Sequence, residues 1–525
     1  MIDRDASMGP DGLTRRDRDL IRDVLARYPD VRRVTLFGSR AMGTFGRGSD
    51  IDLALEGRDL DARALTRIAT ELEDSDLPYK VDLLLRDEQL EPKLEAHIRR
   101  HGKPFGWEQT TLGSLGDASR NAIVGGPFGS NLVSNDYADQ GVPVIRGQNM
   151  GFGRWVSGEF VFVSDAKADS LRANWARPGD VVFTQRGTLG QVAIVPGGPW
   201  ARYVVSQSQM KATIDPQKAD PHYVYYVFSN PSEKEYIAAN AIQTGVPHTN
   251  LTQLRCHPIF LPPLDEQRVI ASVLGALDDK IEQNRRTAQA LEQLARAIFR
   301  AWFVDFEPVK AKAAGATAFP SMPQPVFDAL PTIFTDSAIG PVPEGWSVVR
   351  LDDILTLQRG FDLPKQSRND GSHPIFASSG MSGRHSEWKV RGPGVTTGRS
   401  GMLGQVFFVD RDFWPLNTSL WVKEYKRSNP WHAYFLLQTL DLAQFNAGSA
   451  VPTLNRNHVH SLPRVAAPDY LLAAFGQMCD STFSLEQQLR IESDRIATIR
   501  DYLLPKLLSG QIRVRDAERS AGAVA

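Results

Sequence analysis

Three aspartates near the N-terminus have the side-chain type and the spacing of a metal-binding carboxylate cluster. Asp50 and Asp52 are separated by one residue in an apolar stretch. Alternate side chains of a β-strand point to the same face, so both carboxylates are expected on one side. Asp82 follows Val81 in a second apolar stretch and can complete the cluster from a neighbouring strand. Carboxylate oxygens are preferred ligands of Mg2+, so Asp50, Asp52 and Asp82 are predicted to bind Mg2+.

The elements that must position these aspartates alternate along residues 1–105. Apolar runs predict strands at 31–37, 51–55 and 79–85, and apolar residues at helical spacing predict helices around 20–25 and over 65–72. Strands that alternate with helices favour an α/β layer structure. We therefore predict one N-terminal α/β domain that carries the three aspartates on adjacent strands.

The segment Phe-Gly-Ser-Arg-Ala-Met-Gly at 37–43, followed by the aspartates, resembles the minimal nucleotidyltransferase family of the polymerase-β-like fold. The resemblance implies a nucleoside triphosphate substrate and two Mg2+ ions, one activating an attacking hydroxyl and one stabilising the leaving pyrophosphate. It also implies that Gly38, Ser39 and Arg40 bind the nucleotide, while Met42 stands where the family usually has a basic residue. The alternative is a retained fold without activity.

The rest of the chain repeats itself. The matching anchors are Trp107 and Trp346, the Gly-x-x-Gly-Gln-Val loops that begin at Gly187 and Gly401, and the Val-Pro pairs that begin at Val246 and Val451. The offset between copies falls from 239 residues at the first anchor to 214 and then 205. Insertions and deletions therefore lie between anchors whose order is kept. Short strand-like runs, including 142–145, 181–184, 192–195 and 208–214, predict β-rich domains at 106–263 and 345–467.

A long helix is predicted after each β-rich domain, at 264–308 and 468–515. In the first helix, apolar residues alternate spacings of four and three from Ile270 to Trp302, with Asn284 at a core position. In the second, the seam runs from Phe475 through Leu485 to Leu503. A proline-containing connector at 309–344 returns the chain, which favours an antiparallel coiled coil; two independent amphipathic helices are the alternative. Residues 516–525 form a tail.

The repeat region resembles the specificity subunit of type I restriction-modification enzymes. The motifs are Gly-Trp-x4-Leu at 106–112 and 345–351, Arg-Pro-Gly-Asp at 177–180, Leu-Pro-Pro-Leu-Asp-Glu-Gln at 261–267, and Asp-Tyr-Leu-Leu-Pro-Lys-Leu-Leu-Ser-Gly at 501–510. The resemblance implies two target-recognition domains that each read half of a split double-stranded DNA sequence, with the helices as a ruler between them. The second copy lacks the Leu-Asp-Glu-Gln helix start.

Candidate DNA-contacting residues are polar or basic side chains in the loops of the two β-rich domains. In the first domain they are Arg146, Gln148, Asn149, Arg154, Arg186, Gln207 and Lys211, and in the second they are Lys365, Gln366, Arg368, Arg384, Lys389 and Arg399. The second domain is the more basic, with 14 lysines and arginines against 9 aspartates and glutamates over 346–467. For each single residue, an ordinary solvated side chain is an open alternative.

The resemblance also implies partner subunits, namely modification (methyltransferase) subunits and a restriction subunit with a translocation motor. Candidate partner contacts are Glu266 and Gln267 at the start of the first helix, and Trp302 and Phe303 at its end. No Walker, methyltransferase or nuclease motif stands in the repeat region, so recognition is expected to be separate from cutting and methylation, without a cofactor. The Gly187 and Gly401 loops are interpreted as tight turns between strands.

Two function classes follow. The first is a DNA specificity subunit with a fused nucleotidyltransferase-like domain, and the second is an active nucleotidyltransferase that modifies a protein or RNA and uses the repeat as a targeting scaffold. A weaker alternative is an accessory chain that binds modification subunits but not DNA.

The two cysteines, Cys256 and Cys479, show no metal-ligand spacing, and no apolar run is long enough to span a membrane. We expect a cytoplasmic protein.

Overall fold

The computed structural model describes residues 8–510 and 512, apart from residues 10, 26, 29, 58–59, 88–89, 106, 152, 244–245 and 447–450. The predicted tail at 516–525 and the glycine at 106 therefore lie outside the described residues. The chain divides into two compact units, Met1–Gln283 with Glu492–Ala525, and Asn284–Ile491. None of the helices in the described part of the chain combines the length and apolar character that a membrane span requires.

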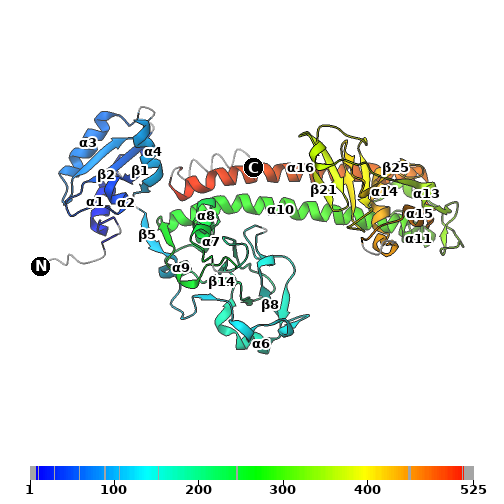
Figure 1. Cartoon of the computed structure of the whole chain (residues 1–525), viewed down its shortest axis with the longest axis horizontal. Coiled ribbons are helices and arrows are strands. Elements are labelled where there is room, and N and C mark those ends of the chain that lie inside the picture. Colours follow the sequence, from blue (N-terminus) through cyan, green and yellow to red (C-terminus); the bar gives the residue numbers. More distant parts are fainter. Residues whose placement is uncertain are drawn as a thin grey trace. The chain divides into compact units, whose positions relative to one another are not determined.

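The N-terminal domain in the first unit is a four-stranded sheet with helices (Figure 1). Its strands are β1 (Val31–Phe37), β2 (Ile51–Gly57), β3 (Val81–Leu85) and β4 (Lys103–Pro104), in the order β3-β2-β1-β4. Its helices are α1 (Arg15–Leu25), α2 (Gly38–Met42), α3 (Ala62–Glu73) and α4 (Pro92–His101). The β2–β3 pair is parallel, and β1 is antiparallel to β2 and β4. The predicted α/β domain is confirmed.

The first repeat domain, defined as residues 107–263, contains two main sheets. One has the order β12 (Val192–Ile194), β11 (Val181–Thr184), β14 (Gln209–Ala212), β6 (Ile123–Gly125). The other has the order β10 (Trp175–Ala176), β13 (Tyr203–Val205), β8 (Val142–Ile145), β9 (Val161–Val163), β7 (Tyr137–Ala138). A short antiparallel pair, β5 (Glu108–Thr111) with β15 (Pro258–Leu261), joins the two ends of the domain.

The second repeat domain, residues 346–467, lies in the second unit and repeats this topology. Its main sheet has the order β23 (Val406–Val409), β22 (Gly394–Gly398), β25 (Ser419–Tyr425), β19 (Leu355–Arg359). Its smaller sheet has the order β21 (Gly380–His385), β20 (His373–Ala377), β24 (Trp414–Pro415). Strand β18 (Ser347–Arg350) pairs with β26 (Pro463–Ala466) and joins the ends. The sequence repeat is therefore also a structural repeat.

Short helices recur in matching places of the two copies. The pairs are α5 (Leu112–Leu115) with α13 (Leu351–Ile354), α7 (Pro221–Ser229) with α14 (Pro430–Gln438), and α9 (Leu251–Arg255) with α15 (Arg456–His460). Both α7 and α14 begin with proline behind an N-cap side chain, Asp220 or Asn429, that accepts backbone N–H hydrogen bonds. Helices α6 (Asp165–Ser170) and α8 (Pro231–Ala239) belong to the first copy.

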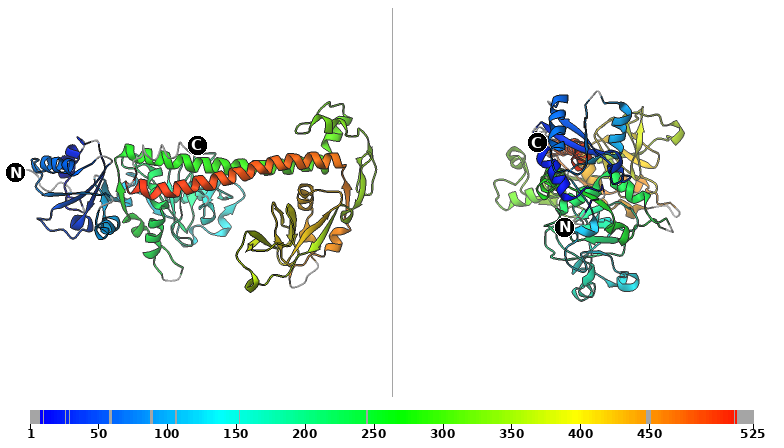
Figure 2. Two further views of the ribbon diagram at one scale, coloured as in Figure 1. Left: turned by 90° about the horizontal axis from the view of Figure 1, so that it is seen from above. Right: turned by 90° about the vertical axis from the view of Figure 1, so that its left-hand side faces the viewer.

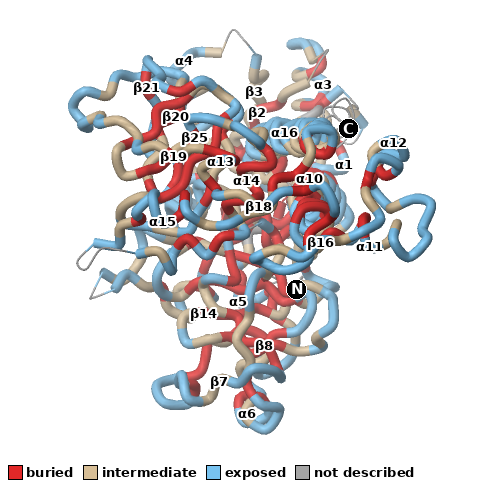
Figure 3. Tube along the Cα trace, turned by 90° about the vertical axis from the view of Figure 1, so that its right-hand side faces the viewer, coloured by how far each residue is buried: buried red, intermediate tan, exposed pale blue. Residues whose placement is uncertain are grey.

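Two long helices, α10 (Leu264–Phe303) and α16 (Asp469–Leu508), lie side by side within each unit (Figure 2). In the first unit, Leu274 of α10 shares a core with Leu503 of α16. In the second unit, Phe299 of α10 shares a core with Phe475 of α16. Early residues of α10 therefore meet late residues of α16 and the reverse, so the helices pair antiparallel, as predicted. Figure 3 shows the buried residues, in red, along the sheets and on α10.

Details of the two helices and the connector differ from prediction. Helix α10 ends at Phe303 rather than at 308, because the buried Phe306 takes a left-handed conformation with φ of 52° before α11 (Glu307–Ala313). Helix α16 ends at Leu508, and its Leu485, predicted in the seam, is 44% exposed. The predicted connector contains α12 (Gln324–Asp328) and the strand pair β16 (Phe334–Thr335) with β17 (Val342–Pro343).

The imidazole of His432 on α14 packs between α14 and α10. It contacts the rings of Phe299 and Phe303 at centroid distances of 5.5 and 4.9 Å. Burial lowers the pKa of His432 to about 3, so the folded second unit holds a neutral imidazole at ordinary pH. An unfolded histidine titrates near pH 6.5, so the unfolded chain binds the extra proton between that pH and about 3.

We expect the free energy of unfolding of the second unit to be highest above about pH 6.5 and to fall as the pH decreases through this window. The contribution of His432 has a limiting slope of about 1.4 kcal/mol per pH unit. Denaturant titrations followed by tryptophan fluorescence at pH 7 and pH 5 measure the loss. His432→Phe should show a smaller loss between the two pH values, and an identical loss in both proteins would refute the assignment.

Candidate nucleic-acid interface and carboxylate site

A set of loops meets at one end of the main sheet in the first repeat domain. The backbone N–H groups of Gln185 and Arg186 both donate to the carbonyl of Ser208, at 2.7 and 3.3 Å. The backbone N–H of Thr249 donates to the carbonyl of Gln185 at 3.1 Å. These bonds join residues 185–191, 206–208 and 246–249, which we call the first loop cluster.

The second repeat domain contains the same hydrogen bonds. The N–H groups of Arg399 and Ser400 donate to the carbonyl of Thr418, at 2.8 and 3.0 Å, and the N–H of Leu454 donates to Arg399 at 2.7 Å. Residues 399–405, 416–418 and 451–454 thus form a second loop cluster. The bonds fix the correspondence, with Arg399 in the place of Gln185, Ser400 in the place of Arg186, and Thr418 in the place of Ser208.

Glycines at the turn of each cluster support the interpretation of these loops as tight turns between strands. Gly187 and Gly190, between β11 and β12, have φ of 95° and 80°. Gly401 and Gly404, between β22 and β23, have φ of 93° and 91°. Residues with a Cβ rarely adopt these angles, so glycine is required for the turn.

An open depression of about 500 Å³ lies on the first loop cluster. It is lined by Arg186, Gly187, Ser208, Val246 and His248. Arg186 is exposed, and within the described residues its guanidinium has no hydrogen-bond or ion-pair acceptor. A guanidinium offers five N–H donors in a planar fork that fits phosphates and the acceptor edge of guanine. This depression is the candidate nucleic-acid contact of the first repeat domain.

Three predicted DNA contacts of the first repeat domain are wrong, because their side chains are buried in internal contacts. The Asn149 amide is fully buried and donates to the carbonyls of Ser157 and Glu159. Arg154 pairs with Asp279 of α10. Lys211 lies 3.7 Å from Asp180, and burial lowers the pKa of its amine.

The remaining candidates of the first copy stay as predictions. Gln148 and Gln207 are exposed, although each amide also donates to backbone carbonyls, and Arg146 is half-buried. In the second copy, Lys365, Gln366, Arg384 and Lys389 are exposed, and Arg368 and Arg399 are half-buried. Arg399 donates to the carbonyl of Asn417 at 3.0 Å, inside the second loop cluster.

Three predicted partner contacts are also buried inside the chain. Gln267 is 1% exposed, donates to the carbonyl of Pro262 and accepts from the N–H of Asp220. Trp302 and Phe303 are buried in the core of the second unit. These three side chains hold the fold together and are not available to a partner surface, so their assignment is corrected. Glu266 is half-buried.

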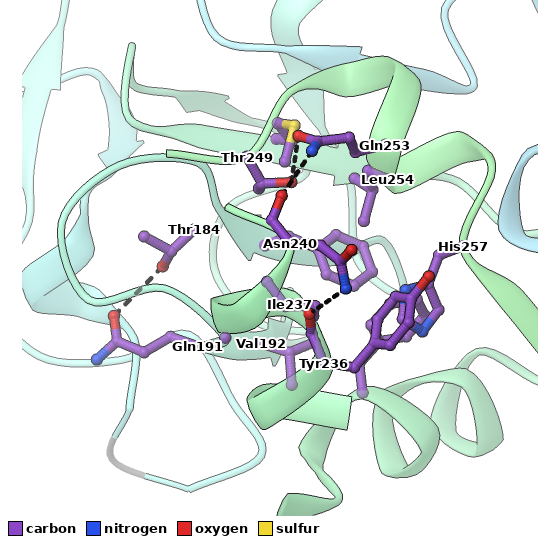
Figure 4. A pocket seen from close by; sticks show the side chains of 14 residues that line it. Thr184, Gln191, Val192, Tyr236, Ile237, Asn240, Thr249, Gln253, Leu254 and His257 are labelled. Atoms are coloured by element: carbon purple, nitrogen blue, oxygen red, sulfur yellow. Dashed lines mark hydrogen bonds between the residues drawn. The ribbon is translucent and has the colours of Figure 1, made fainter. Parts of the chain in front are cut away.

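A small cavity of about 40 Å³ lies behind the first loop cluster (Figure 4). Its lining includes Thr184, Gln191, Tyr236 and His257, and the imidazole of His257 is 2.8 Å from the carboxylate of Glu233. Ligand pockets usually measure some hundreds of Å³. This cavity is a packing gap rather than a ligand site.

The predicted carboxylate site lies in the N-terminal domain, where β1 ends and β2 and β3 begin. Asp52 on β2 stands directly opposite Asp82 on the parallel strand β3. Gly38, with φ of 68°, approaches Asp52 so closely that a Cβ at position 38 would lie 2.1 Å from a carboxylate oxygen. Burial, followed by the negative charges of Asp82 and Asp50, raises the pKa of the Asp52 carboxyl.

The site has the donor chemistry for a hard divalent cation, but its side chains do not converge on one point. Asp82 forms an ion pair with Lys80 at 2.6 Å. In the described ranges, no three Asp, Glu, His or Cys side chains make a set ready to hold a metal ion as they stand. Burial is the main cause of the raised pKa of Asp52, and a cation would offset the smaller contribution from the charges of Asp82 and Asp50 once Asp82 turned away from Lys80.

Arg40, predicted to bind the nucleotide, is 1% exposed and has a different role. Its guanidinium donates to the backbone carbonyls of Asp11, Ser49 and Asp50, and it lies over the ring of Tyr79 at 4.2 Å. Arg40 therefore holds the backbone that carries Asp50 and cannot reach a nucleotide. Gly38 and Ser39 remain as the predicted phosphate contacts.

Comparisons with known proteins divide the chain in the same way. Residues 106–293 and 343–463 match the family described as "Type I restriction modification DNA specificity domain". Residues 19–106 match the family described as "Polymerase beta, Nucleotidyltransferase". Both sequence resemblances are thus confirmed.

Two curated relatives match most of the repeat region. The type I restriction enzyme MjaIX specificity subunit of Methanocaldococcus jannaschii is 24% identical over 370 residues, which are 64% of this chain and 78% of the relative. The type I restriction enzyme HindI specificity subunit of Haemophilus influenzae is 23% identical over 466 residues, which are 76% of this chain and 98% of the relative.

Solved structures also resemble the chain. A type I restriction-modification S subunit from M. genitalium shares 16% identity at a TM-score of 0.48 and covers 76% of this chain and 96% of its own. A toxin–antitoxin structure with AMP-PNP shares 31% identity at a TM-score of 0.16 and covers 17% of this chain and 71% of its own.

The contact between Gly38 and Asp52 gives a test of the carboxylate site. Gly38→Ala should destabilise the N-terminal domain by about 1–3 kcal/mol beyond the strain of a positive φ, because its methyl group would displace the Asp52 carboxylate. Gly43→Ala is the matched control, since Gly43 has φ of 73° with no atom within 4 Å of the added Cβ. Limited proteolysis and denaturant titration of both variants measure the difference. Equal losses in the two variants would contradict the close contact.

Proposed function

The chain belongs to the type I restriction modification DNA specificity family, and from that premise we propose that it reads a two-part double-stranded DNA sequence. The observation that carries this proposal is the pair of loop clusters with matching backbone hydrogen bonds and different side chains. Two domains that share a backbone conformation but present different side chains can recognise two different half-targets. Specificity arises from base-edge donors and acceptors, and phosphate contacts set the register.

The two clusters carry side chains of different charge and hydrogen-bonding capacity at matching positions. Arg186 of the first cluster is replaced by Ser400 in the second, and Gln185 is replaced by Arg399. Arginine favours guanine, through bidentate bonds to O6 and N7, whereas serine accepts several bases and glutamine favours adenine. We infer that positions 186 and 400 discriminate bases in separate half-targets.

We further propose that modification subunits and a restriction subunit with a translocation motor assemble on the chain and carry out methylation and cleavage. Since Gln267, Trp302 and Phe303 are buried, the partner surface is assigned to exposed apolar residues of the long helices instead. In the second unit these are Leu294 of α10 with Leu485 and Ile491 of α16, which are 50, 44 and 45% exposed. Apolar side chains that gather into an exposed patch mark protein interfaces, and this is the role proposed for these three.

Sequencing of DNA methylated by the full chain with its modification subunit tests the reading function. The wild-type chain should direct methylation to a two-part motif, and a one-part motif would contradict the proposal. Arg186→Ser should relax the base preference at one position of one half by about tenfold or more, since a bidentate arginine–guanine pair discriminates strongly. Ser400→Arg is the reciprocal control and should change the other half alone. An unaltered motif in Arg186→Ser would exclude Arg186 as a base contact.

The N-terminal domain supports a second, smaller proposal, that it transfers nucleotides. Asp50, Asp52 and Asp82 would hold Mg2+, which would stabilise charge on the phosphates of a nucleoside triphosphate. Gly38 would let the nucleotide approach the backbone, and the Ser39 hydroxyl would donate to phosphate. The family match over 19–106 and the Asp52–Asp82 pair support this activity. The larger match, over the repeat region, favours DNA specificity as the function of the chain as a whole.

Labelled ATP and Mg2+ with the full chain and cell extract test this activity. Label should appear on a protein or RNA, and Asp50→Ala combined with Asp52→Ala should reduce it by at least about 10- to 100-fold, the loss typical of groups that only support metal ligands. Glu73→Ala combined with Asp74→Ala removes the same charge from exposed positions of the same domain and should have little effect. Equal transfer by both double variants would contradict a catalytic role for the aspartates.

A further inference from the structure

Phe128 is an aromatic residue left in solvent on an otherwise fixed loop. Its side chain is 86% exposed, the highest value among the exposed large apolar residues that the structure describes. It lies on residues 126–132, which follow strand β6 at the edge of the main sheet of the first repeat domain. Single apolar side chains in solvent are common on protein surfaces, so the inference rests on where Phe128 lies and not on its exposure alone.

The loop that carries Phe128 is held by specific contacts. The Gln207 amide donates to the carbonyls of Gly129 and Leu132, the latter at 3.0 Å. Gly126 packs so tightly that a Cβ there would lie 1.9 Å from the carbonyl oxygen of Ser206. A braced loop presents its side chain with little loss of entropy on binding.

The same contacts place this loop beside the first loop cluster. Gln207 adjoins Ser208, which lines the depression with Arg186. The N–H of Gly126 donates to the carbonyl of Gln209 at 2.8 Å. Phe128 therefore stands on a loop that borders the candidate DNA-reading surface.

The second copy has the brace but not the aromatic side chain. The N–H of Gly360 donates to Ser419 at 3.0 Å, as that of Gly126 does to Gln209, and the Asn417 amide donates to the carboxylate of Asp362. Asn417 thus takes the place of Gln207, and Asp362 takes the place of Phe128. A carboxylate cannot stack on a base and is repelled by phosphate, so the two copies differ in kind at this position.

We propose that Phe128 inserts into the DNA of the first half-target and stacks on an unstacked base. This inference rests on the proposed DNA-reading function. Apolar wedges open base steps, and stacking of a base on an aromatic ring contributes substantially to affinity. Arg186 holds the adjacent base edge while Phe128 opens the step, so the first half-target is both read and deformed. The second half-target, which faces Asp362, is read without this wedge.

The test uses the full chain and the duplex that the wild-type chain enriches from a random-sequence pool, with 2-aminopurine placed at successive positions of each half. Wild-type binding should raise the fluorescence at one step of the first half, because the base there loses its stacking partner. Phe128→Ala should abolish this rise and weaken binding about 10- to 100-fold. Phe128→Trp should retain both, since its ring also stacks.

Val133→Ala is the matched control, because Val133 is 42% exposed next to the same loop and its loss should leave both readouts unchanged. Binding and fluorescence that are unaltered in Phe128→Ala would overturn the inference alone. A Phe128→Ala chain that binds DNA normally but assembles poorly with the modification subunit would also overturn it and would assign the ring to a protein interface. A wild-type chain that enriches no two-part duplex would overturn the proposed function and this inference together.

Discussion

Each repeat domain depends on a short strand pair that joins its two ends next to a long helix. β15 ends at Leu261 and α10 begins at Leu264, and β26 ends at Ala466 and α16 begins at Asp469. Prolines occupy the connections, at 262, 263 and 468, and restrict the backbone there. The strand pairs β5–β15 and β18–β26 thus tie both ends of a domain to the start of a helix. Insertions between the ends change the loops without moving that attachment.

The two domains are attached to the helices by different interactions. In the first unit, Arg154 pairs with Asp279 of α10, and the Tyr226 hydroxyl donates to Asp278, which also accepts from Arg500 of α16. Gly275 leaves room for Arg154, since a Cβ there would lie 2.4 Å from the guanidinium. Arg154 and Asp278 are buried, and leaving either charge without its partner would be costly, so these pairs constrain how the domain packs on α10.

The second unit uses stacked rings instead. Trp431 of α14 lies parallel to Phe408 at 3.6 Å between ring centroids, and close to parallel to Phe483 of α16 at 4.2 Å. Its indole N–H donates to Asp480 at 2.7 Å. Apolar contact is less directional than a charge network, and the single indole bond supplies the orientation. The same topology is therefore stabilised by charge pairs in one copy and by aromatic packing in the other.

Sequence patterns predicted the elements well and the roles of single side chains poorly. The repeat, the strands and the helix pairing depend on periodic apolar residues and glycine turns, which are local signals. The burial of Arg154 and Lys211 depends on Asp279 and Asp180, which are distant in sequence, so each looks like any other surface cation until the fold is known. Arg40 resembles a nucleotide-binding residue in the sequence, because its burial against backbone carbonyls is visible only in the fold. The exposure of Phe128 likewise has no signature in the sequence.

The matching hydrogen bonds of the loop clusters explain how two copies could diverge without losing their shape. Every bond that fixes the correspondence joins backbone N–H to backbone carbonyl, as between Arg186 and Ser208 or between Ser400 and Thr418. The side chains of Arg186 and Ser400 take no part in these bonds, so replacing arginine by serine at this position changes the chemistry presented while the backbone stays in place. Gly187 and Gly401 adopt the positive φ angles that the turn requires. In a scaffold of this kind, backbone atoms determine the shape of the loops and side-chain atoms determine what they recognise.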